Sequence, residues 1–386
     1  MKAKRVLWAI LRFPALVISS AVVRGLPVRG RPQLVVFGFS AWKTFIHDWF
    51  PDRNVIVAPA KVGRWAFHLY WKWIIRRDPR TEVISWQYKG PKNIKYYCEA
   101  NRIHFKYVED GFIRSVSLGA LHTPPMSLAF DRRDMYFVAE SRTDLEDILL
   151  TYDFDADRVL MDRARKAISH LLDTGISKYN SGRKVDIETI YGPKRTKRVL
   201  VIGQVERDAS IAFGCSVRIT NNDLVRMARA ENPDAQIIYK PHPEVLSGIA
   251  PSGSDPDEVR CISQIIEDNV SLADSFRTID HVYTITSLSG FEALLRGIKV
   301  TTVGCPFYSG WGLTDDRQRN ERRDRILTLE QLFAGAYILY PKYFDPEHKR
   351  YVEIEDVLSI LTLKREEAII KAHHSRPEVP LTRPDV

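Results

Sequence analysis

PFYSGWGLTDDR, from Pro306 to Arg317, is the most informative stretch of this chain, and SLSGFEALLRGIKVTTVG precedes it across Cys305. The earlier stretch, Ser287 to Gly304, predicts a helix and then a short strand, and the later one predicts a glycine-rich loop. Glycine lets the backbone approach a ligand closely, and such loops often carry function. We therefore expect part of an α/β domain in which Tyr308 and Trp311 lie at a ligand site.

Composition indicates a soluble protein of two domains. The chain has 386 residues, of which 45% are hydrophobic and 27% are charged, which is enough for two cores of ordinary size. Its four cysteines are scattered and form no CxxC pair. This spacing argues against a zinc site and a disulfide scaffold, and it favours a reducing compartment.

Positive charge is concentrated at the N-terminus. Residues 1–47 contain eight Lys/Arg and no acid, whereas the rest of the chain is nearly neutral, so we expect no nucleic-acid partner. A basic arm mixed with apolar residues suits an anionic membrane surface. We predict that Val6–Val23 forms an interfacial helix on a membrane. A spanning or signal segment, interrupted by Arg12 and Pro14, and a helix packed on the protein are the alternatives.

Apolar runs alternate with helical patterns in two units, which implies parallel strands in two α/β domains. We expect a segment 1–32, domains at 33–185 and 195–340, and closing helices with a tail at 341–386. The polar run 178–196 predicts a linker. The expected strands are Gln33–Phe39, Asn54–Ala58, Glu82–Trp86, Ile103–Val108, Arg198–Ile202, Ala235–Tyr239, His281–Thr286 and Lys299–Val303. The expected helices are Gly63–Arg77, Asp144–Leu150, Ala156–Asp173, Leu224–Glu231, Phe291–Arg296, Leu329–Ala336 and Ile354–Lys364.

Four polar clusters follow predicted strands. Ligands of open α/β sheets bind at the carboxyl ends of strands, so these clusters are expected to converge on one site between the domains. The clusters are Glu109-Asp110-Gly111, Gln204 to Ser210, Lys240 to Pro243, and Ser287 to Gly290.

Carboxylates in two of the clusters are candidate catalytic groups. Glu109 and Asp110 are adjacent, and their repulsion raises one pKa toward a value suited to proton transfer. Arg114, close by, adds anion-binding capacity. Asp208 is a candidate nucleophile toward an anomeric carbon. The alternatives are a solvated turn for Glu109-Asp110 and a helix cap for Asp208.

The other two clusters suit a nucleotide and its phosphate. Two prolines restrict the backbone around His242, and Lys240 adds a positive charge. Ser287, Ser289 and Gly290 begin a helix, where hydroxyl and N–H groups bind anions. The alternatives are a buried structural His242, and simple capping by Ser289 with Glu292 in the capping-box position.

Several common sites are missing from the sequence. There is no Walker A, GxSxG or GxGxxG pattern, which disfavours NTPases, hydrolases and dehydrogenases. Aspartates alternate at 153–157 and 255–257, but neither run follows an apolar strand, so no metal site is expected.

Several strings, in a fixed order between Gln33 and Tyr340, resemble the capsule polysaccharide family of bacterial β-Kdo transferases, the KpsC type. The longest, Thr286 to Asp316, is also the most specific. The others are VEDGFIRSVSLG (108–119), PPMSLAFD (124–131), SRTDLEDIL (141–149), SKYN (177–180), GQVERDASI (203–211) and YKPHPEV (239–245).

This resemblance implies an α/β fold of the GT-B type, with two Rossmann-like domains facing across a cleft. It implies retaining transfer of Kdo from CMP-Kdo, without a metal or other cofactor, to a phospholipid-linked or Kdo-terminated glycan. Asp208 is then the nucleophile, Glu109 or Asp110 the acid/base, and His242 with Lys240 the nucleotide contacts. The other implied donor contacts are Gln204, Arg114, Ser287, Ser289, Gly290, Tyr308 and Trp311.

The resemblance also implies a place of work and leaves rivals open. We expect a peripheral protein on the cytoplasmic face of the inner membrane that meets an anionic lipid surface and other capsule assembly proteins. Typical family members carry two transferase modules in tandem, and this chain has room for one. The alternatives are an inverting, sialyltransferase-like enzyme with another nucleotide sugar, and an inactive scaffold.

Overall fold

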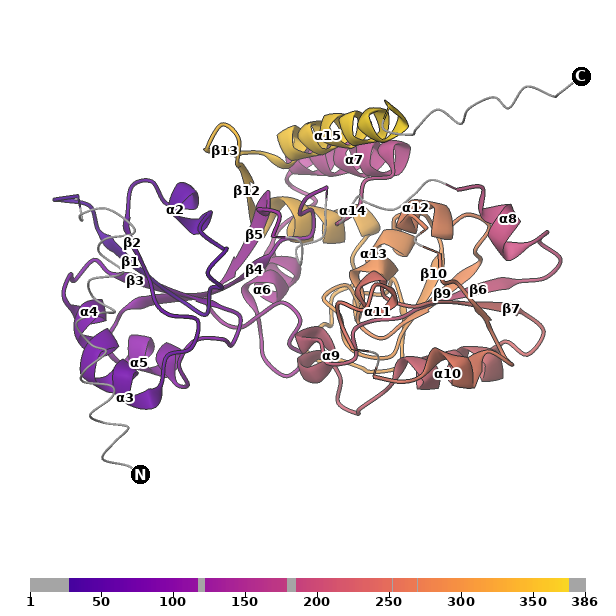
Figure 1. Cartoon of the computed structure of the whole chain (residues 1–386), viewed down its shortest axis with the longest axis horizontal. Helices are drawn as coiled ribbons and strands as arrows, with labels where there is room; N and C mark the ends of the chain where they lie inside the picture. Colours follow the sequence, from indigo (N-terminus) through magenta and orange to yellow (C-terminus); the bar gives the residue numbers. More distant parts are fainter. Residues whose placement is uncertain (1–27, 117–121, 179–184, 252, 269, 375–386) are drawn as a thin grey trace, which may run out of the picture.

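The computed structural model describes residues 28–116, 122–178, 185–251, 253–268 and 270–374, with side chains to residue 367. The described chain forms an α/β protein built on two separate sheets, one drawn on the left of Figure 1 and one on the right. The interfacial helix predicted for residues 6–23 lies outside the described residues. Within the described ranges, no helix has the length and hydropathy needed to cross a bilayer.

The N-terminal sheet has seven strands in the order β13-β12-β5-β4-β3-β1-β2. Strands β1 to β4 are parallel and follow the 2-1-3-4 order of doubly wound folds, whose switch point lies between β1 and β3. The remaining strands, β5, β12 and β13, are antiparallel to their neighbours. The first five strands are β1 (Gln33–Phe37), β2 (Asn54–Val57), β3 (Glu82–Trp86), β4 (His104–Asp110) and β5 (Ser127–Asp131).

Helices pack on the N-terminal sheet, and further helices lie in the chain between this sheet and the second one. One continuous helical run, α3 (Arg64–Ala66), η1 (Phe67–Trp71) and α4 (Lys72–Arg76), packs on the sheet through Phe67, Trp71 and Ile75. The other helices of this part are α2 (Ile46–Trp49), α5 (Ile94–Ala100), α6 (Asp144–Thr151) and α7 (Arg158–Thr174).

The second sheet is fully parallel, with the order β11-β10-β9-β6-β7-β8. Renumbered along the chain, this is the 3-2-1-4-5-6 order of the Rossmann fold, and its switch point lies between β6 and β9. The strands are β6 (Arg198–Ile202), β7 (Gln236–Lys240), β8 (Gln264–Ile265), β9 (His281–Thr284), β10 (Lys299–Thr302) and β11 (Asp315–Asp316).

Short helices follow the strands of the second sheet on the side that faces the first sheet (Figure 1). These are α9 (Ala209–Gly214) after β6, α11 (Pro243–Leu246) after β7 and α13 (Leu288–Leu294) after β9. The remaining elements are α8 (Ile187–Tyr191), α10 (Asn221–Glu231), η3 (Pro256–Val259), α12 (Leu272–Ser275), α14 (Leu329–Phe333) and η4 (Ala334–Leu339).

The C-terminal part of the chain returns to the N-terminal sheet. Strands β12 (Pro341–Asp345) and β13 (Arg350–Val352) extend that sheet beyond β5, and α15 (Ile354–His374) lies along α7 (Figure 1). Arg163 of α7 ties the two helices together, since its guanidinium pairs with Glu355 at 2.8 Å. The sequence predicted only helices and a tail after residue 340, so both strands were missed.

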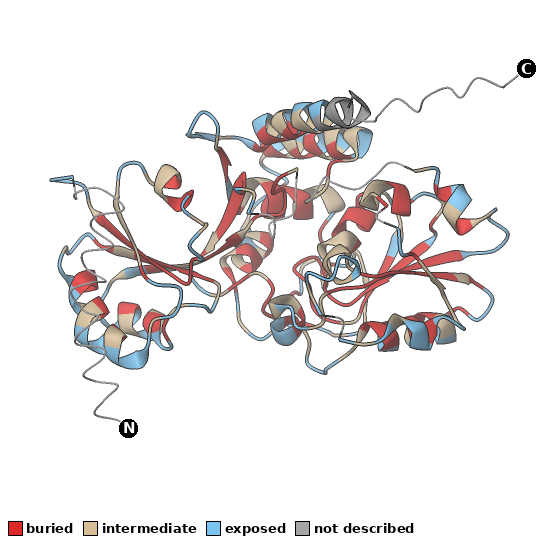
Figure 2. Ribbon diagram, in the orientation of Figure 1, coloured by how far each residue is buried: buried red, intermediate tan, exposed pale blue. Residues whose placement is uncertain are grey.

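The strands expected from sequence are present, and their ends differ from the prediction by at most two residues. Figure 2 shows that the central strands of both sheets, such as β1, β3, β6 and β9, are buried along almost their whole length, which explains their continuous apolar patterns. The sequence also missed β5, which runs antiparallel to β4 with Asp110 opposite Leu128. The described residues between β4 and β5 contain no helix, and an antiparallel strand needs no crossover connection.

Candidate functional site

Gln204 links the ends of the two strands, β6 and β9, that flank the switch point of the second sheet. Its side-chain amide donates to Thr286 Oγ1 at 3.1 Å and accepts from the Thr286 backbone N–H at 2.8 Å. Asn221 holds the Gln204 backbone from the other side, through both its N–H and its carbonyl. Gln204, predicted as a donor contact, therefore joins the end of β6 to the end of β9.

His242 and Lys240 lie at the end of β7 in different environments. His242 caps α11, and its Nδ1 accepts a hydrogen bond from the Glu244 N–H at 3.2 Å. Burial lowers the pKa of His242, as do the charges of Lys178 and Lys240, whereas Asp208 raises it. The neutral ring then carries its proton on Nε2.

Lys240 is buried and has a hydrogen-bond partner of its own. Its ammonium donates to the carbonyl of Val270 at 3.1 Å, and burial lowers its pKa to about 8. The structure therefore gives Lys240 a partner of its own, which anchors β7.

Asp208 is exposed and caps α9, as the structural alternative predicted. One carboxylate oxygen, Oδ1, accepts from the Ser210 N–H at 2.7 Å. This bond fixes the direction of the side chain. The negative charge of Asp208 raises the pKa values of both His242 and Glu244, so these groups share one region.

Glu109 and Asp110 lie at the end of β4, where the sequence placed them. Burial raises the pKa of Glu109, and the adjacent Asp110 raises it further, to about 7. Among the described residues, Glu109 Oε2 and Asp110 Oδ1 are buried without a hydrogen-bond partner. Buried polar atoms of this kind are uncommon in native structures.

Arg114 holds Asp110 in place. Its side chain is 1% exposed, and its Nε donates to Asp110 Oδ2 at 2.7 Å. Gly111, between them, has no room for a side chain, because a Cβ there would lie 2.2 Å from Ser127 Oγ. The structure thus engages Arg114 with Asp110 rather than leaving it open to a donor carboxylate.

Lys43 was not singled out from the sequence, yet it lies at the switch point of the first sheet. Its ammonium lies over the ring of Trp86, the last residue of β3. Burial lowers the pKa of Lys43, and the charges of Asp110 and Glu109 raise it. The sequence shows only a lysine in the loop after β1, and its place beside two acids is set by tertiary folding.

Lys178 and Tyr136 interact electrostatically with groups at the ends of both sheets. Neither residue was singled out from the sequence. The Lys178 charge lowers the pKa values of both Glu109 and His242. Burial raises the pKa of Tyr136, and the charges of Glu109 and Asp208 raise it further. The two acidic clusters therefore act on the same phenol. The only sequence signal for Lys178 was its place in the SKYN string.

Ser287 and its neighbours complete the convergence of the four predicted clusters. Ser287, and not Ser289, caps α13, since its hydroxyl accepts from the Ser289 N–H at 3.2 Å. Thr286, directly before it, donates to Ser210 Oγ at 3.2 Å. Gly290 faces Tyr308, because a Cβ at this position would lie 2.2 Å from the Tyr308 hydroxyl.

Tyr308 and Trp311 lie in the core rather than at a ligand site. Both are 0% exposed, and both polar groups donate to backbone carbonyls, Tyr308 to Ser287 and Trp311 to Phe307. The Tyr308 ring packs against Phe291 of α13, which in turn stacks on Tyr337 of η4. Neither side chain is exposed to contact a donor.

Glu292 is a further buried acid, on α13. Burial raises its pKa to about 7, and its Oε1 accepts a long hydrogen bond from the Lys178 N–H at 3.4 Å. Among the described residues its Oε2 has no hydrogen-bond partner. Glu292 therefore lies beside the same Lys178 that connects the two sheet ends.

The aspartate runs at 153–157 and 255–257 have local roles. Asp157 caps α7 and Asp255 caps η3. In the part of the chain that the structure describes, no group of three or more His, Cys, Asp or Glu side chains is placed to hold a metal ion.

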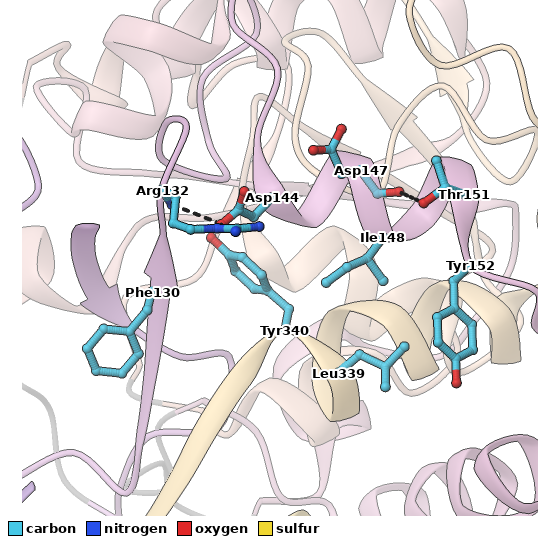
Figure 3. A pocket seen from close by; sticks show the side chains of 9 residues that line it. All are labelled: Phe130, Arg132, Asp144, Asp147, Ile148, Thr151, Tyr152, Leu339 and Tyr340. Atoms are coloured by element: carbon cyan, nitrogen blue, oxygen red, sulfur yellow. Dashed lines mark hydrogen bonds and ion pairs between the residues drawn. The ribbon is translucent and has the colours of Figure 1, made fainter. Parts of the chain in front are cut away.

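A separate hollow of about 320 Å³ lies between β5, α6 and η4 (Figure 3). Its carboxylates are engaged by arginines: Asp144 by Arg132 at 3.0 Å and Asp147 by Arg133 at 2.5 Å. None of the predicted site residues lines it. The lining residues are Phe130, Arg132, Asp144, Asp147, Ile148, Thr151, Tyr152, Leu339 and Tyr340.

Residues 81–343, about two thirds of the chain, match the family described as capsule polysaccharide biosynthesis protein. The chain belongs to this family. The match begins just before β3 and ends in β12, so it includes the ends of β4, β6, β7 and β9 that carry the candidate site.

Relatives of known name support the same family. The chain is 45% identical over 336 residues to the lipopolysaccharide-processing protein LpsZ of Rhizobium meliloti, covering 87% of this chain and 75% of LpsZ. It is 40% identical to the capsule polysaccharide modification protein LipA of Neisseria meningitidis, covering 86% of this chain. That alignment spans 46% of LipA, less than half of its length.

Two solved structures share both sequence and fold with the chain. The KpsC β-Kdo 2,4 transferase of Thermosulfurimonas dismutans is 32% identical with a TM-score of 0.71, over 87% of this chain and 99% of that one. The KpsC β-Kdo 2,7 transferase of the same organism is 31% identical with a TM-score of 0.65, over 86% and 99%. The chain is thus a glycosyltransferase-like capsule protein with the GT-B-like α/β fold predicted from its sequence.

Proposed function

We propose that this protein transfers Kdo from CMP-Kdo, with retention of anomeric configuration, to a lipid-linked or Kdo-terminated acceptor. The observation that carries the proposal is the meeting of Glu109, Asp110, Asp208 and His242 around Lys178 and Tyr136. Charged groups that perturb one another's pKa values, some of them buried, are typical of catalytic sites. The likeness to two KpsC β-Kdo transferases supports the sugar.

In the first step, Asp208 attacks the anomeric carbon of the donor. Its Oδ1 is held by the Ser210 N–H, so Oδ2 is the nucleophilic atom. A bond forms between this oxygen and the anomeric carbon, the bond to the CMP phosphate oxygen breaks, and CMP leaves with the electron pair. Configuration at the anomeric carbon inverts once.

In the second step, an acceptor hydroxyl attacks the same carbon from the opposite side. Its proton passes to the Glu109 carboxylate, the bond to Asp208 breaks, and the second inversion restores the original configuration. We assign the proton to Glu109, because the pKa of Glu109 is raised to about 7 whereas Asp110 is bound by Arg114. Asp110 supplies the neighbouring charge that keeps this pKa high.

The second sheet holds the nucleotide. His242 Nε2–H donates to the cytidine or its phosphate, and the hydroxyls of Ser287 and Ser289 bind the phosphate. Lys240 and Gln204 hold the strand ends that carry these contacts, through hydrogen bonds to Val270 and Thr286. The positive charge of Lys178 faces the negative charge that develops on the leaving phosphate.

The decisive experiment is incubation with CMP-Kdo and a panel of lipid-linked and Kdo-tipped acceptors, followed by NMR of the product. We expect a β-Kdo linkage with some acceptor and no product with another nucleotide sugar. An inverted linkage would contradict the two-step mechanism. If UDP, but not CMP, raises the melting temperature of the protein, the donor assignment is wrong. A protein that binds neither nucleotide and transfers nothing would instead be a scaffold.

A further inference from the structure

The helical run α3–η1–α4 exposes a row of large apolar side chains. Trp65 is 65% exposed, Leu69 61% and Trp73 60%. They recur every four residues and therefore lie on one side of the helix. On α5, beside this run, Tyr96 is 74% exposed. We name Trp65, Leu69, Trp73 and Tyr96 the aromatic face.

The aromatic face is not part of the core that holds the domain together. The same helical run buries a different set of residues, Phe67, Trp71, Ile74 and Ile75, against the sheet. Figure 2 shows the exposed ribbon of α3 at the outer edge of the N-terminal domain, away from the second sheet. Among the described residues, the outward row of Trp65, Leu69 and Trp73 belongs to no core cluster of the domain. Contiguous exposed apolar surface of this kind marks an interaction site.

Positive charge surrounds the aromatic face. Residues 61–80 contain six Lys/Arg and one acidic residue, and five of these basic residues are exposed, namely Lys61, Arg64, Arg76, Arg77 and Arg80. The single acid, Asp78, already pairs with Arg80 at 3.2 Å. Arg77 lies over the ring of Trp73, 5.8 Å from its centroid. The cations are therefore available to a partner that carries negative charge at a surface.

We propose that the aromatic face is a membrane-binding surface for anionic phospholipids. Tryptophan and tyrosine prefer the boundary between headgroups and acyl chains, and leucine enters the acyl region. Arginine and lysine beside them bind lipid phosphates, and they extend their charged ends to the headgroup layer. A helix with an apolar row and a cationic border is the arrangement found in interfacial membrane anchors. All four residues of this surface belong to the described part of the chain.

The test is co-sedimentation of the full chain with vesicles, without any substrate. The vesicles are phosphatidylcholine alone, or phosphatidylcholine with phosphatidylglycerol. We expect binding to the anionic vesicles, and we expect Trp65→Ser/Leu69→Ser/Trp73→Ser to reduce the partition coefficient about tenfold or more. The matched control, Val159→Ser/Val217→Ser/Ile326→Ser, removes three exposed apolar side chains elsewhere and should change it less than about twofold.

A second variant tests the charges. Arg64→Gln/Arg76→Gln/Arg77→Gln is expected to lower binding to anionic vesicles about tenfold and to leave binding to neutral vesicles unchanged. Contact itself is measured in a Trp8→Phe background, where lipids brominated on their acyl chains should quench tryptophan emission. Trp65→Phe/Trp73→Phe should abolish that quenching.

Three outcomes would overturn the proposal. The first is unchanged quenching in Trp65→Phe/Trp73→Phe, because the lipid would then lie elsewhere. The second is equal loss of binding in the control and the aromatic-face variants. The third is a dimer of the wild type that becomes monomeric in the aromatic-face variant, because a second copy would then cover the face. None of these readouts depends on Kdo transfer, so membrane binding and the proposed reaction can fail separately.

Discussion

The carboxyl ends of the two sheets position their polar side chains in different ways. At the second sheet, Asp208, His242 and Ser287 are all helix caps, each held by one backbone N–H of a short helix. At the first sheet, Glu109 and Arg114 are buried, and the Arg114 guanidinium pairs with the Asp110 carboxylate. A cap fixes a side chain and leaves its other polar atom available, whereas burial changes its pKa. We infer that side chains at the second sheet bind the donor and supply the nucleophile. Side chains at the first sheet accept the proton of the acceptor hydroxyl.

The largest effect is expected from Asp208, whose two roles can be separated. Asp208→Asn keeps the cap of α9, because asparagine caps as well as aspartate, but it removes the nucleophile. We expect transfer to fall on the order of a thousandfold or more, with CMP binding and thermal stability retained. Measurement requires initial rates with CMP-Kdo and a thermal shift with CMP.

Asp208→Ala serves as the comparison, since it removes both the cap and the nucleophile. It should match Asp208→Asn in activity and be less stable by about 1 kcal/mol. If Asp208→Asn transfers Kdo at near wild-type rates, Asp208 is only a cap and the two-step mechanism is wrong.

The next largest effect separates the two acids of the first sheet. Glu109→Gln keeps the shape of the side chain but cannot accept the acceptor proton, so the rate should fall about a hundredfold or more. Asp110→Asn leaves the buried Arg114 without its charge partner. We expect this variant to lose stability as well as activity, because an unpaired buried charge is costly. Rates and urea unfolding of both variants, compared side by side, distinguish a proton carrier from a structural partner.

A result in which only Asp110→Asn loses activity, with Glu109→Gln unaffected, would move the acid/base role to Asp110. Wild-type stability of Asp110→Asn would contradict the structural role of the Arg114 pair.

The sequence predicted the strands of this fold better than it predicted the sheet edges. Glu82–Trp86 and Arg198–Ile202 were placed to the residue, because buried parallel strands are continuous apolar runs between polar loops. Strands β12 and β13 were missed because they extend the sheet from β5, more than two hundred residues earlier in the chain. Local pattern carries no information about such long-range pairing.

The same limit applied to the site. The Glu109, Asp208 and His242 clusters were found because each follows a strand or a glycine turn. Lys43 and Lys178 were missed because nothing local distinguishes a buried lysine from an exposed one; only folding brings them to the acids. The prediction that Tyr308 and Trp311 lie at a ligand site was wrong, because a glycine-rich loop with aromatic residues suits core packing as well as ligand binding.

Lys43 provides a smaller, pH-dependent test of the first sheet. Its positive charge lowers the pKa of Glu109, so Lys43→Met should raise that pKa further. Because Glu109 must be ionised to accept the proton, the acid limb of the rate profile should move to higher pH, by about one unit. The plateau rate at high pH should stay near that of the wild type.

Lys342→Met is the matched control, since Lys342 is exposed on β12, at a different strand of the same sheet. It should leave the pH profile unchanged. A Lys43→Met profile that coincides with that of the wild type would show that Lys43 does not act on the proton carrier.

A further effect, on stability rather than on activity, is expected at Glu292, which lies near the same Lys178 that acts on Glu109 and His242. Its pKa is about 7 in the folded protein, whereas the ordinary value for a glutamate is 4.5, so the folded protein binds the extra proton. Stability must therefore fall as pH rises from about 4.5 to 7, by ~3 kcal/mol at most at ~1.4 kcal/mol per pKa unit. Glu292→Gln removes the titration, and its unfolding free energy should lose that part of the pH dependence. The measurement is urea unfolding of both proteins at pH 5 and pH 8. If the difference between the two proteins is the same at both pH values, Glu292 is charged in the folded state, and the charges of Arg296 and Lys178 then outweigh the effect of its burial.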